Sequence, residues 1–299
     1  MRNNIIVVVN PISGDIDKSE FIDAVALFAE KENFNPVIYN TSGVNDIDKI
    51  KVLYQTYKPQ RIIITGGDGT IKMVAEAMEN QDVILGILPA GSANGLAVDL
   101  NLPATLEENL EIAFHNEYMM IDMISINGKK SVHLSDIGLN AELIKNYEKS
   151  TIRGKLGYAL QAVSTLIDLD EPFFATITGD FPTIECVARM IVIANSKKYG
   201  TGVSINPNGL MNDGKFELVI LKNLDLVVLG KIITGNITTD DAEDIEIISV
   251  EKAVITTTVP VSFQVDGEYC GSETKLNVEI LPKHMKVAVP YVNPDYRFI

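Results

Sequence analysis

One short motif constrains this chain more than any other feature. It is the run Thr65-Gly66-Gly67-Asp68-Gly69-Thr70, which follows the apolar residues 61–64 and precedes the helix-like residues 71–80. A strand, a glycine turn and a helix in that order predict a phosphate-binding loop, because glycines let a polyanion approach backbone N–H groups and Thr70 can cap the helix. Asp68 would repel phosphate unless a cation lies between them, so the motif indicates Mg²⁺ and a nucleoside triphosphate. A plain glycine-rich turn is the competing interpretation.

Two further loops of this kind follow predicted strands. Asn10-Pro11-Ile12-Ser13-Gly14 follows residues 5–9, and Pro89-Ala90-Gly91-Ser92-Ala93-Asn94-Gly95-Leu96-Ala97 follows residues 83–88. Because ligands bind at the carboxyl edge of open α/β sheets, neighbouring loops there can hold a nucleotide from both sides. Thr41-Ser42-Gly43 is another candidate, with a plain Ser/Thr turn as its alternative. The P-loop pattern Gly-x-x-x-x-Gly-Lys-Ser/Thr is absent from the sequence, which excludes that class.

The pattern of predicted elements changes near residue 122. Before it, strands alternate with helices, at residues 5–9, 20–31, 37–39, 46–57, 61–64, 71–80, 83–88 and 106–115. After it come two helix-like stretches at 141–149 and 156–169 and then strands at 174–178, 187–193, 216–221, 245–249, 253–258, 261–265, 276–280 and 286–289. Alternation predicts a parallel sheet covered by helices, and the strand-rich part suggests an antiparallel sandwich or barrel. We therefore expect two domains with an active site between them.

Composition excludes several classes of protein. The 299 residues carry a net charge of −15 with scattered basic residues, which argues against nucleic-acid binding. No apolar run approaches the roughly 20 residues that span a bilayer. Cys186 and Cys270 have no metal-like spacing, which favours free thiols in a reducing cytosol. We expect a cytoplasmic protein, at most peripheral at the membrane, whose strand edges offer a surface for a homodimer without requiring one.

The three loop motifs, in this order, resemble the catalytic domain shared by diacylglycerol kinases, sphingosine kinases and bacterial lipid kinases. NAD kinases and phosphofructokinases carry a similar Gly-Gly-Asp-Gly-Thr element, and the motif at 89–97 separates the chain from them. Four later segments resemble further family motifs, namely Ser135-Asp136-Ile137-Gly138-Leu139-Asn140-Ala141, Gly154-Lys155-Leu156-Gly157-Tyr158, Asn212-Asp213-Gly214 and Asp266-Gly267-Glu268. The resemblance thus covers nearly the whole chain. It implies an α/β nucleotide-binding domain at 1–122, to which 290–299 returns, and a β-sandwich lipid-binding domain at 123–289.

The same resemblance implies roles for individual residues. Asp68 would hold the catalytic Mg²⁺ near the transferred phosphate. The residues expected to contact ATP are Asn10, Pro11, Ser13, Gly14, Thr41, Gly66, Gly67, Asp68, Gly69, Thr70, Lys72, Gly91, Ser92 and Asn94. One carboxylate of Asp266-Gly267-Glu268 would accept the proton of a lipid hydroxyl, and the sequence does not choose between Asp266 and Glu268. An ordinary hairpin turn is the alternative for this segment.

The sequence departs from the family pattern at two places. Asn212-Asp213-Gly214 stands where bacterial members often have Asp-Asp-Gly. By analogy Asp213, with the backbone oxygens of Leu210 and Lys215, would hold a structural Mg²⁺, and an unoccupied turn is the alternative. Ser92-Ala93-Asn94-Gly95 replaces the Thr-x-Asn-Asp of many bacterial members and is closer to the sphingosine-kinase and ceramide-kinase form. The acceptor lipid therefore stays open.

The resulting hypothesis is an ATP- and Mg²⁺-dependent kinase that phosphorylates diacylglycerol or a sphingoid-type lipid at the membrane surface. Its alternatives are a small-molecule kinase of the NAD-kinase type and a catalytically idle nucleotide- or lipid-binding protein. Basic candidates for membrane contact are Lys197-Lys198-Tyr199, Arg153 with Lys155, and Lys283-His284 with Lys286. Each of them has an ordinary solvated patch as its alternative.

Overall fold

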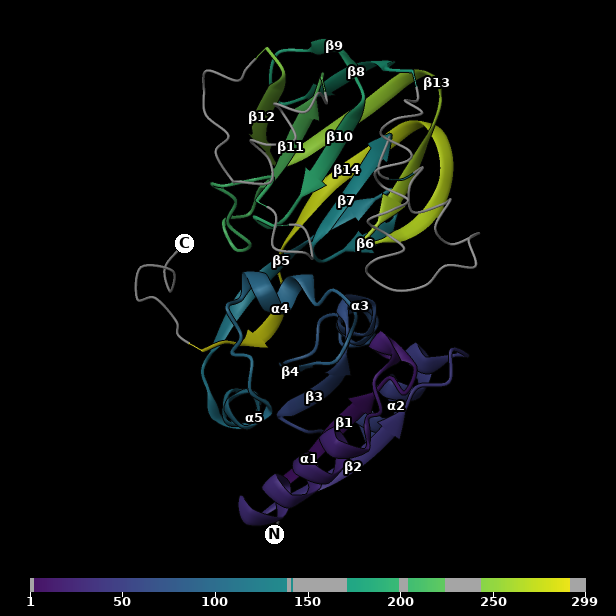
Figure 1. The fold of residues 1–299 in the computed structure, drawn as a ribbon. Coiled ribbons are helices and arrows are strands. Elements are labelled where there is room, and N and C mark those ends of the chain that lie inside the picture. Colours follow the sequence, from purple (N-terminus) through teal and green to yellow (C-terminus); the bar gives the residue numbers. More distant parts are fainter. Residues whose placement is uncertain (1–2, 139–140, 142–170, 199–203, 224–242, 291–299) are drawn as a thin grey trace. The chain divides into compact units, whose positions relative to one another are not determined.

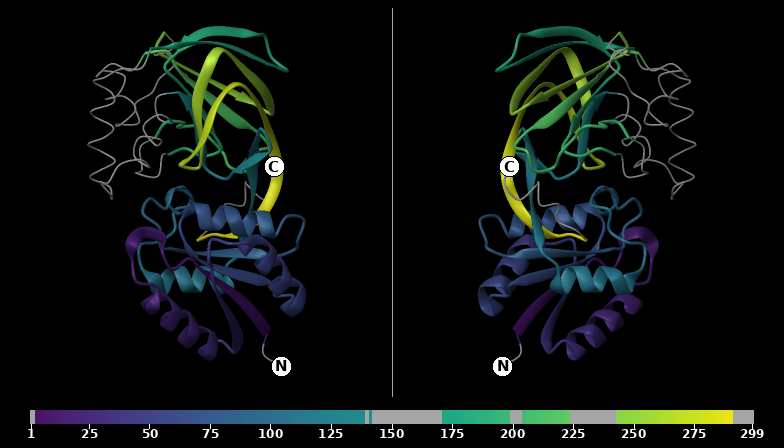
Figure 2. Two further views of the ribbon diagram at one scale, coloured as in Figure 1. Left: turned by 90° about the vertical axis from the view of Figure 1, so that its right-hand side faces the viewer. Right: turned by 90° about the vertical axis from the view of Figure 1, so that its left-hand side faces the viewer.

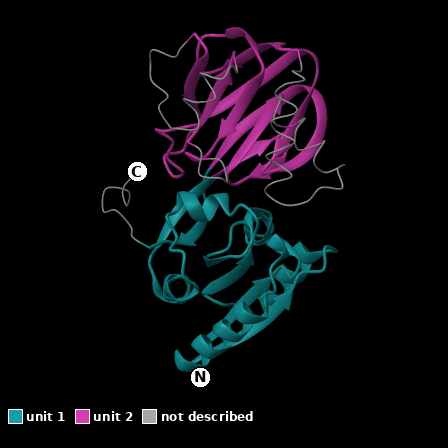
Figure 3. Cartoon of the chain, viewed as in Figure 1, with its two compact units in different colours: residues 1–122, 282–299 teal, residues 123–281 magenta. Residues whose placement is uncertain are grey.

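The protein is described by a computed structural model that covers residues 3–138, 141, 171–198, 204–223 and 243–290 (Figure 1). The chain divides into two compact units, residues 1–122 with 282–299 and residues 123–281 (Figure 3). The domain boundaries expected from the sequence stay a prediction, since compactness does not test independent folding. The expected helices at 141–149 and 156–169 lie outside the described residues, apart from the helical Ala141, as does the segment 291–299.

The first unit contains a parallel sheet in the order β2-β1-β3-β4, with the end of β14 beside β4. Its elements are β1 (Asn3–Val9), the short 3₁₀ turn η1 (Ser13–Asp15), α1 (Ser19–Lys31), β2 (Phe34–Asn40), α2 (Asp46–Tyr57), β3 (Arg61–Gly66), α3 (Asp68–Ala77), β4 (Ile84–Pro89), α4 (Gly95–Asp99) and α5 (Leu106–His115). Helices α1 and α5 pack on one face of the sheet, and α2 and α3 pack on the other (Figure 2). Both faces are therefore buried, which explains why β1 and β3 are nearly continuous Ile and Val runs.

Helix α3 begins earlier than the sequence predicts. Its first residue is Asp68, and its N-cap is Gly67 in an extended conformation. Thr70 lies buried inside the first turn, where its Oγ1 accepts a hydrogen bond from Nδ2 of Asn10 at 3.1 Å. The prediction that Thr70 caps this helix is therefore wrong, because the two glycines let the chain turn into the helix before Thr70 is reached.

The second unit is a β-sandwich (Figure 2). One run of strands has the order β12-β11-β10-β7-β13-β14, β8 pairs with β13 and β9, and β5 pairs with β6 and β14. The strands are β5 (Tyr118–Ile126), β6 (Lys129–Ser131), β7 (Leu134–Gly138), β8 (Phe173–Gly179), β9 (Ile184–Ala188), β10 (Met190–Ala194), β11 (Phe216–Leu221), β12 (Ile245–Val250), β13 (Lys252–Val265) and β14 (Glu268–Ala288). A buried cluster that includes Ile177, Ile191, Leu218, Ile255 and Leu276 fills the space between the layers.

Strand β13 changes its pairing partner along its length. Residues 253–257 pair with β8, residues 263–265 pair with β7, and the register against β14 shifts between Thr256 and Val261. Two separate strands at 253–258 and 261–265 were predicted wrongly, because Pro260 lies at this irregularity, where a strand tolerates proline without ending. Strand changes of this kind make the corners of sandwiches.

Three other strand predictions differ from the structure. Strand β14 is continuous, although two strands were expected at 276–280 and 286–289. The expected strand at 187–193 is two strands, β9 and β10, that meet at Arg189. Strands β5, β6 and β7 were not predicted as strands. Within the described ranges, no helix has the length and apolar character needed to cross a bilayer.

Candidate functional site

Three loops meet at the carboxyl edge of the sheet in the first unit. They follow the parallel strands β1, β3 and β4. Asn10 joins the first loop to the second through its bond to Thr70, and Ser13 joins the first loop to the third, since its Oγ donates to the backbone oxygen of Ala90 at 2.9 Å. The three motifs that the sequence singled out thus form one hydrogen-bonded assembly.

Glycine is required where these loops touch. A Cβ built on Gly91 would lie 2.5 Å from Cα of Gly67, and one built on Gly14 would lie 2.9 Å from the backbone oxygen of Ala90. Real Cβ atoms do not approach other backbone atoms so closely. The glycines therefore set the spacing between the loops, and they leave backbone N–H groups uncovered for an anion.

Asp68 ties the second loop to helix α4. Its Oδ2 accepts the backbone N–H of Gly95 at 2.8 Å, and its Oδ1 accepts that of Leu96 at 3.0 Å. The carboxylate thus satisfies two N–H groups at the start of a helix, which a negative charge stabilises. The sequence did not predict this contact, because nothing in the motifs at 65–70 and 89–97 relates one to the other in space.

The third loop is folded around Asn94. This residue has a left-handed conformation (φ 54°) and precedes α4. Its Oδ1 accepts the N–H of Gly91 at 2.7 Å, and its Nδ2 donates to the oxygen of the same residue at 3.0 Å. Asn94 therefore holds its own loop closed, which explains the choice of asparagine at a position with positive φ.

The loop after β2 is held by a buried carboxylate. Asp46 accepts hydrogen bonds from the hydroxyl of Tyr39, from N–H and Oγ of Ser42 (3.0 Å each) and from N–H of Gly43 (2.7 Å). Burial alone would raise the pKa of Asp46, but these donors outweigh it and lower the pKa to about 2. Burial and the nearby Asp46 raise the pKa of Tyr39 to about 12. Thr41, the residue expected to contact ATP, is anchored to Val9 by its backbone N–H at 2.8 Å.

The remaining predicted nucleotide contacts lie on the same edge. Pro11, Gly69 and Ser92 are exposed, and Lys72 is partly buried in the first half of α3. Asp68 and Gly69 are the first residues of α3, so no earlier carbonyl group of the helix can accept a hydrogen bond from their backbone N–H groups. The role of these residues in binding ATP stays a prediction.

The Asp68 carboxylate fits a Mg²⁺ site in which the protein supplies few ligands. Among the described residues, no three His, Cys, Asp or Glu side chains cluster as a metal site would require. Mg²⁺ in nucleotide enzymes is often held by one or two carboxylates, with phosphates and water as its other ligands. Each carboxylate oxygen of Asp68 has one amide donor and keeps a second lone pair. Asp68 therefore fits a Mg²⁺ that arrives with the nucleotide.

In the second unit, Asp266 and Gly267 form the turn between β13 and β14. Both have positive φ (50° and 85°), as in a two-residue hairpin turn. The donors that fix the Asp266 carboxylate include Oγ of Ser131 at 2.8 Å and the N–H groups of Val132 and His133 at 3.0 Å each. The hairpin interpretation is thus correct for the backbone, and the turn also presents a rigidly held carboxylate.

Two buried side chains, Gln264 and Asp136, form a hydrogen-bonded chain that ends at this turn. Nε2 of Gln264 donates to Oδ2 of Asp136 at 2.6 Å, and Oε1 of Gln264 accepts the N–H of Gly267 at 2.7 Å. Gln264 and Asp136 are register partners on β13 and β7, and both are almost fully buried. The Ser135–Ala141 motif therefore contributes Asp136 to the base of the hairpin, which the sequence did not predict.

The expected structural metal site lies in a tight turn. Oδ1 of Asp213 accepts the N–H of Lys215 at 3.0 Å across Gly214 (φ 77°), as in a local Asx turn. The metal role of Asp213, Leu210 and Lys215 stays a prediction. A neighbouring carboxylate was missed: Glu217 is buried, accepts from Nδ2 of Asn206 (2.6 Å) and Oγ of Ser249 (2.9 Å), and has its pKa raised by burial.

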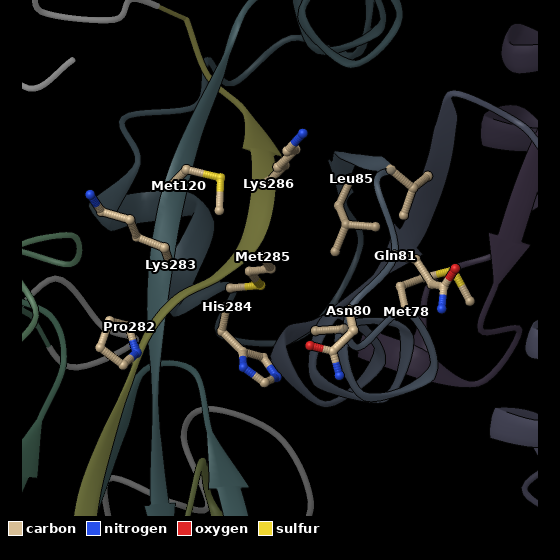
Figure 4. Close-up of a pocket in the computed structure, with 12 residues that line it drawn as sticks. Met78, Asn80, Gln81, Leu85, Met120, Pro282, Lys283, His284, Met285 and Lys286 are labelled. Carbon is tan, nitrogen blue, oxygen red and sulfur yellow. The ribbon is translucent and has the colours of Figure 1, made fainter. Parts of the chain in front are cut away.

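The basic residues at 283–286 line a small pocket of about 170 Å³ in the first unit (Figure 4). It lies at the amino edge of β4, away from the three loops, and Met78, Met120 and Met285 form part of its wall. Nε2 of His284 is 3.7 Å from Oε1 of Glu79, and Lys286 forms an ion pair with Asp82. These charges are partly compensated within the unit.

Comparison with known families shows to which family the chain belongs. Residues 4–126 match the diacylglycerol kinase catalytic domain, and residues 135–289 match the YegS C-terminal NAD kinase beta sandwich-like domain. The chain belongs to the diacylglycerol kinase-like family of lipid kinases. The resemblance stated from the loop motifs is confirmed, and so is the order of an α/β domain followed by a β-sandwich.

Two relatives of this lipid kinase are 25% and 28% identical to it over the aligned residues. Lipid kinase YegS from Escherichia coli (strain K12) is 28% identical over 237 residues, which cover 77% of this chain and 78% of YegS. Protein sll0036 from Synechocystis sp., of uncharacterised function, is 25% identical over 304 residues, covering 95% of this chain and 70% of its own. A solved diacylglycerol kinase from Bacillus anthracis str. Sterne aligns over 98% of both chains with a TM-score of 0.74 and 20% identity, which supports the fold.

Proposed function

We propose that the chain is an ATP- and Mg²⁺-dependent lipid kinase that transfers the γ-phosphate to a hydroxyl of diacylglycerol or of a sphingoid-type lipid. The observation that carries this proposal is the interlocked assembly of three glycine-rich loops at the carboxyl edge of a parallel sheet. Such an assembly presents backbone donors to a polyanion in a fixed arrangement. Membership of the lipid kinase family supports phosphoryl transfer as the chemistry.

In the first unit, the loop residues would bind the triphosphate through backbone N–H groups. Asp68 would hold Mg²⁺, whose charge neutralises the phosphate oxygens when it is bound. Because Asp68 is already fixed by two amides, it needs no rearrangement to present its remaining lone pairs. Preorganisation of this kind lowers the cost of stabilising charge in the transition state.

In the second unit, we propose that Asp266 rather than Glu268 receives the proton of the acceptor hydroxyl. Donors from Ser131, Val132 and His133 orient the Asp266 carboxylate, whereas Glu268 is an exposed side chain at the start of β14. Phosphoryl transfer has a loose transition state, so the base mainly orients the hydroxyl. Rigid placement therefore matters more than high basicity.

Transfer of labelled γ-phosphate tests the proposal. The acceptors are micelle-dispersed diacylglycerol, ceramide, sphingosine and monoacylglycerol, with NAD as a soluble alternative acceptor, and Asp68→Asn is the control enzyme. We expect one lipid to be phosphorylated by the wild type and not by the variant.

Two other outcomes contradict the proposal. Transfer to NAD alone would favour the NAD-kinase type of enzyme. Equal background rates in the wild type and in Asp68→Asn, with ATP still bound, would favour an idle nucleotide- or lipid-binding protein.

A further inference from the structure

A buried lysine contacts the backbone of the first loop, which follows β1. Lys18 is 4% exposed, and its Nζ donates hydrogen bonds to the backbone oxygens of Ser13 at 2.5 Å and Ile16 at 2.8 Å. Lysine is almost never fully buried unless its charge is paired. Lys18 belongs to none of the loop motifs, so its burial beside one of them needs a physical explanation.

The ammonium group of Lys18 fixes the direction of a loop amide. In a trans peptide the C=O and the following N–H point in opposite directions, so the bond to the oxygen of Ser13 turns the N–H of Gly14 away from Lys18. The Ser13 side chain is fixed at the same time by its bond to Ala90. The loop is therefore held from both sides, with its conformation determined by Lys18 and the third loop.

The charge of Lys18 is not cancelled by an ion pair. Within the described part of the chain no carboxylate lies within ion-pair distance of its Nζ, and Asp15 and Asp17 act on it only through space. Asp17 instead accepts hydrogen bonds from N–H and Oγ of Ser19, at 3.0 and 2.6 Å. Two carbonyl oxygens solvate the ammonium without neutralising it. A buried charge of this kind is screened less by salt than a surface charge.

We propose that Lys18 is a positioning residue that gives the first loop a fixed positive charge for the phosphates of a bound nucleotide. The inference rests on the proposed function and adds to it a residue outside the sequence motifs. A chain with a net charge of −15 repels a polyphosphate at long range, so a cation beside the first loop would favour phosphate binding there, in addition to the Mg²⁺ proposed at Asp68.

Nucleotide affinity measured by calorimetry tests the role of Lys18. The ligands are Mg·ATP, Mg·ADP and adenosine, and the variants are Lys18→Met, Lys18→Gln and Lys18→Arg. Gln keeps a hydrogen-bond donor without the charge, and Arg keeps the charge. Lys31→Met is the control, since Lys31 is the last residue of helix α1, whose N-cap is Lys18, and its side chain is 71% exposed.

We expect Lys18→Met and Lys18→Gln to bind ATP about tenfold more weakly, as one charge interaction of ordinary strength implies, and to bind adenosine as the wild type does. Lys18→Arg should restore most of the ATP affinity. An equal loss for ATP and adenosine in Lys18→Gln would show that Lys18 only shapes the loop, and would overturn the inference. Unchanged ATP affinity in the variants would also overturn it, while leaving the proposed function intact.

A wild-type protein that binds no ATP would overturn the proposed function, and the role of Lys18 with it. If Lys18→Met does not fold, Lys18→Gln and Lys18→Arg decide the matter by themselves, because each keeps a donor for the carbonyl oxygens. Thermal unfolding of every variant identifies those that fold.

Discussion

Leu96 donates its backbone N–H to Oδ1 of Asp68 at 3.0 Å, although the two residues lie 28 positions apart in the sequence. Together with the bond from Gly95, this contact makes the second loop and helix α4 one structural piece. The same carboxylate is the residue that we propose as the Mg²⁺ ligand. Its two roles are compatible, because a carboxylate has about four lone-pair positions and the amides take two.

Asp68→Asn should lower kcat/KM for lipid phosphorylation by about 10²- to 10³-fold, the usual effect of removing one group that stabilises transition-state charge. It should also lower the free energy of unfolding by about 1–3 kcal/mol, because the amide group can accept only one of the two N–H bonds. Steady-state kinetics and urea denaturation measure the two effects. Asp48→Asn, at an exposed position in the first turn of α2, is the control and should change neither. A fully active Asp68→Asn enzyme would remove the proposed metal role.

The choice between the two carboxylates of the hairpin can be made by paired variants. Asp266→Asn should lower kcat by at least about 10²-fold with little change in the KM for ATP, as expected for loss of a group that orients the hydroxyl. Glu268→Gln should keep most of the activity, since its side chain is exposed. The reverse order of effects would assign the proton acceptor to Glu268.

Gly91→Ala should weaken both folding and ATP binding. The new Cβ would lie 2.5 Å from Cα of Gly67, so the two loops must separate, which costs about 1–3 kcal/mol of unfolding free energy. Gly128→Ala is a suitable comparison, because nothing lies within 4 Å of its Cβ position and its cost of about 1 kcal/mol comes from positive φ alone. ATP affinity should fall only in Gly91→Ala. Normal ATP binding by that variant would show that the loops need not touch.

The stability of the first unit should depend on pH through Asp46. The pKa of this residue is about 2 in the folded protein, below its value in an unfolded chain of about 3.9. A lowered pKa stabilises the fold above the unfolded value, and this contribution is lost as the pH falls toward 2. The difference in unfolding free energy between wild type and Asp46→Asn should therefore be largest near neutral pH and should shrink between pH 4 and pH 2. Urea denaturation at several pH values measures it, and a difference that grows in acid would contradict the assignment.

Local patterns in the sequence placed most helices and strands of the first unit, although not the short helix α4 or the strand β5. Apolar β-branched runs and helical periodicity placed α2 at 46–57 and α5 at 106–115, as observed. The predicted start of α3 was wrong because a glycine pair permits either a turn or a helix cap, and the neighbouring residues do not decide between the two. Contacts between loops, such as that of Asp68 with Leu96, have no local signal.

Strand continuity in the second unit was harder to predict. Pro260 lies between the two strands expected at 253–258 and 261–265, yet β13 continues through it, because proline is accepted where the ladder is irregular. Strand β14 likewise continues through Pro282. Conversely, the apolar run at 187–193 gave no sign of the change at Arg189 between β9 and β10. These outcomes depend on which strand lies alongside, and that information is not local.

The contact between Gly67 and Gly91 bears on how such a protein can be re-engineered. A loop taken from another kinase and placed here alone would meet neighbours shaped for a different partner, since the backbones of the second and third loops leave no room for a methyl group between them. The three loops should therefore be exchanged as one block, with residues 10–18, 65–72 and 89–97 transferred together. Chimeras that move a single segment would be expected to lose nucleotide binding even when every transplanted residue is functional in its original protein.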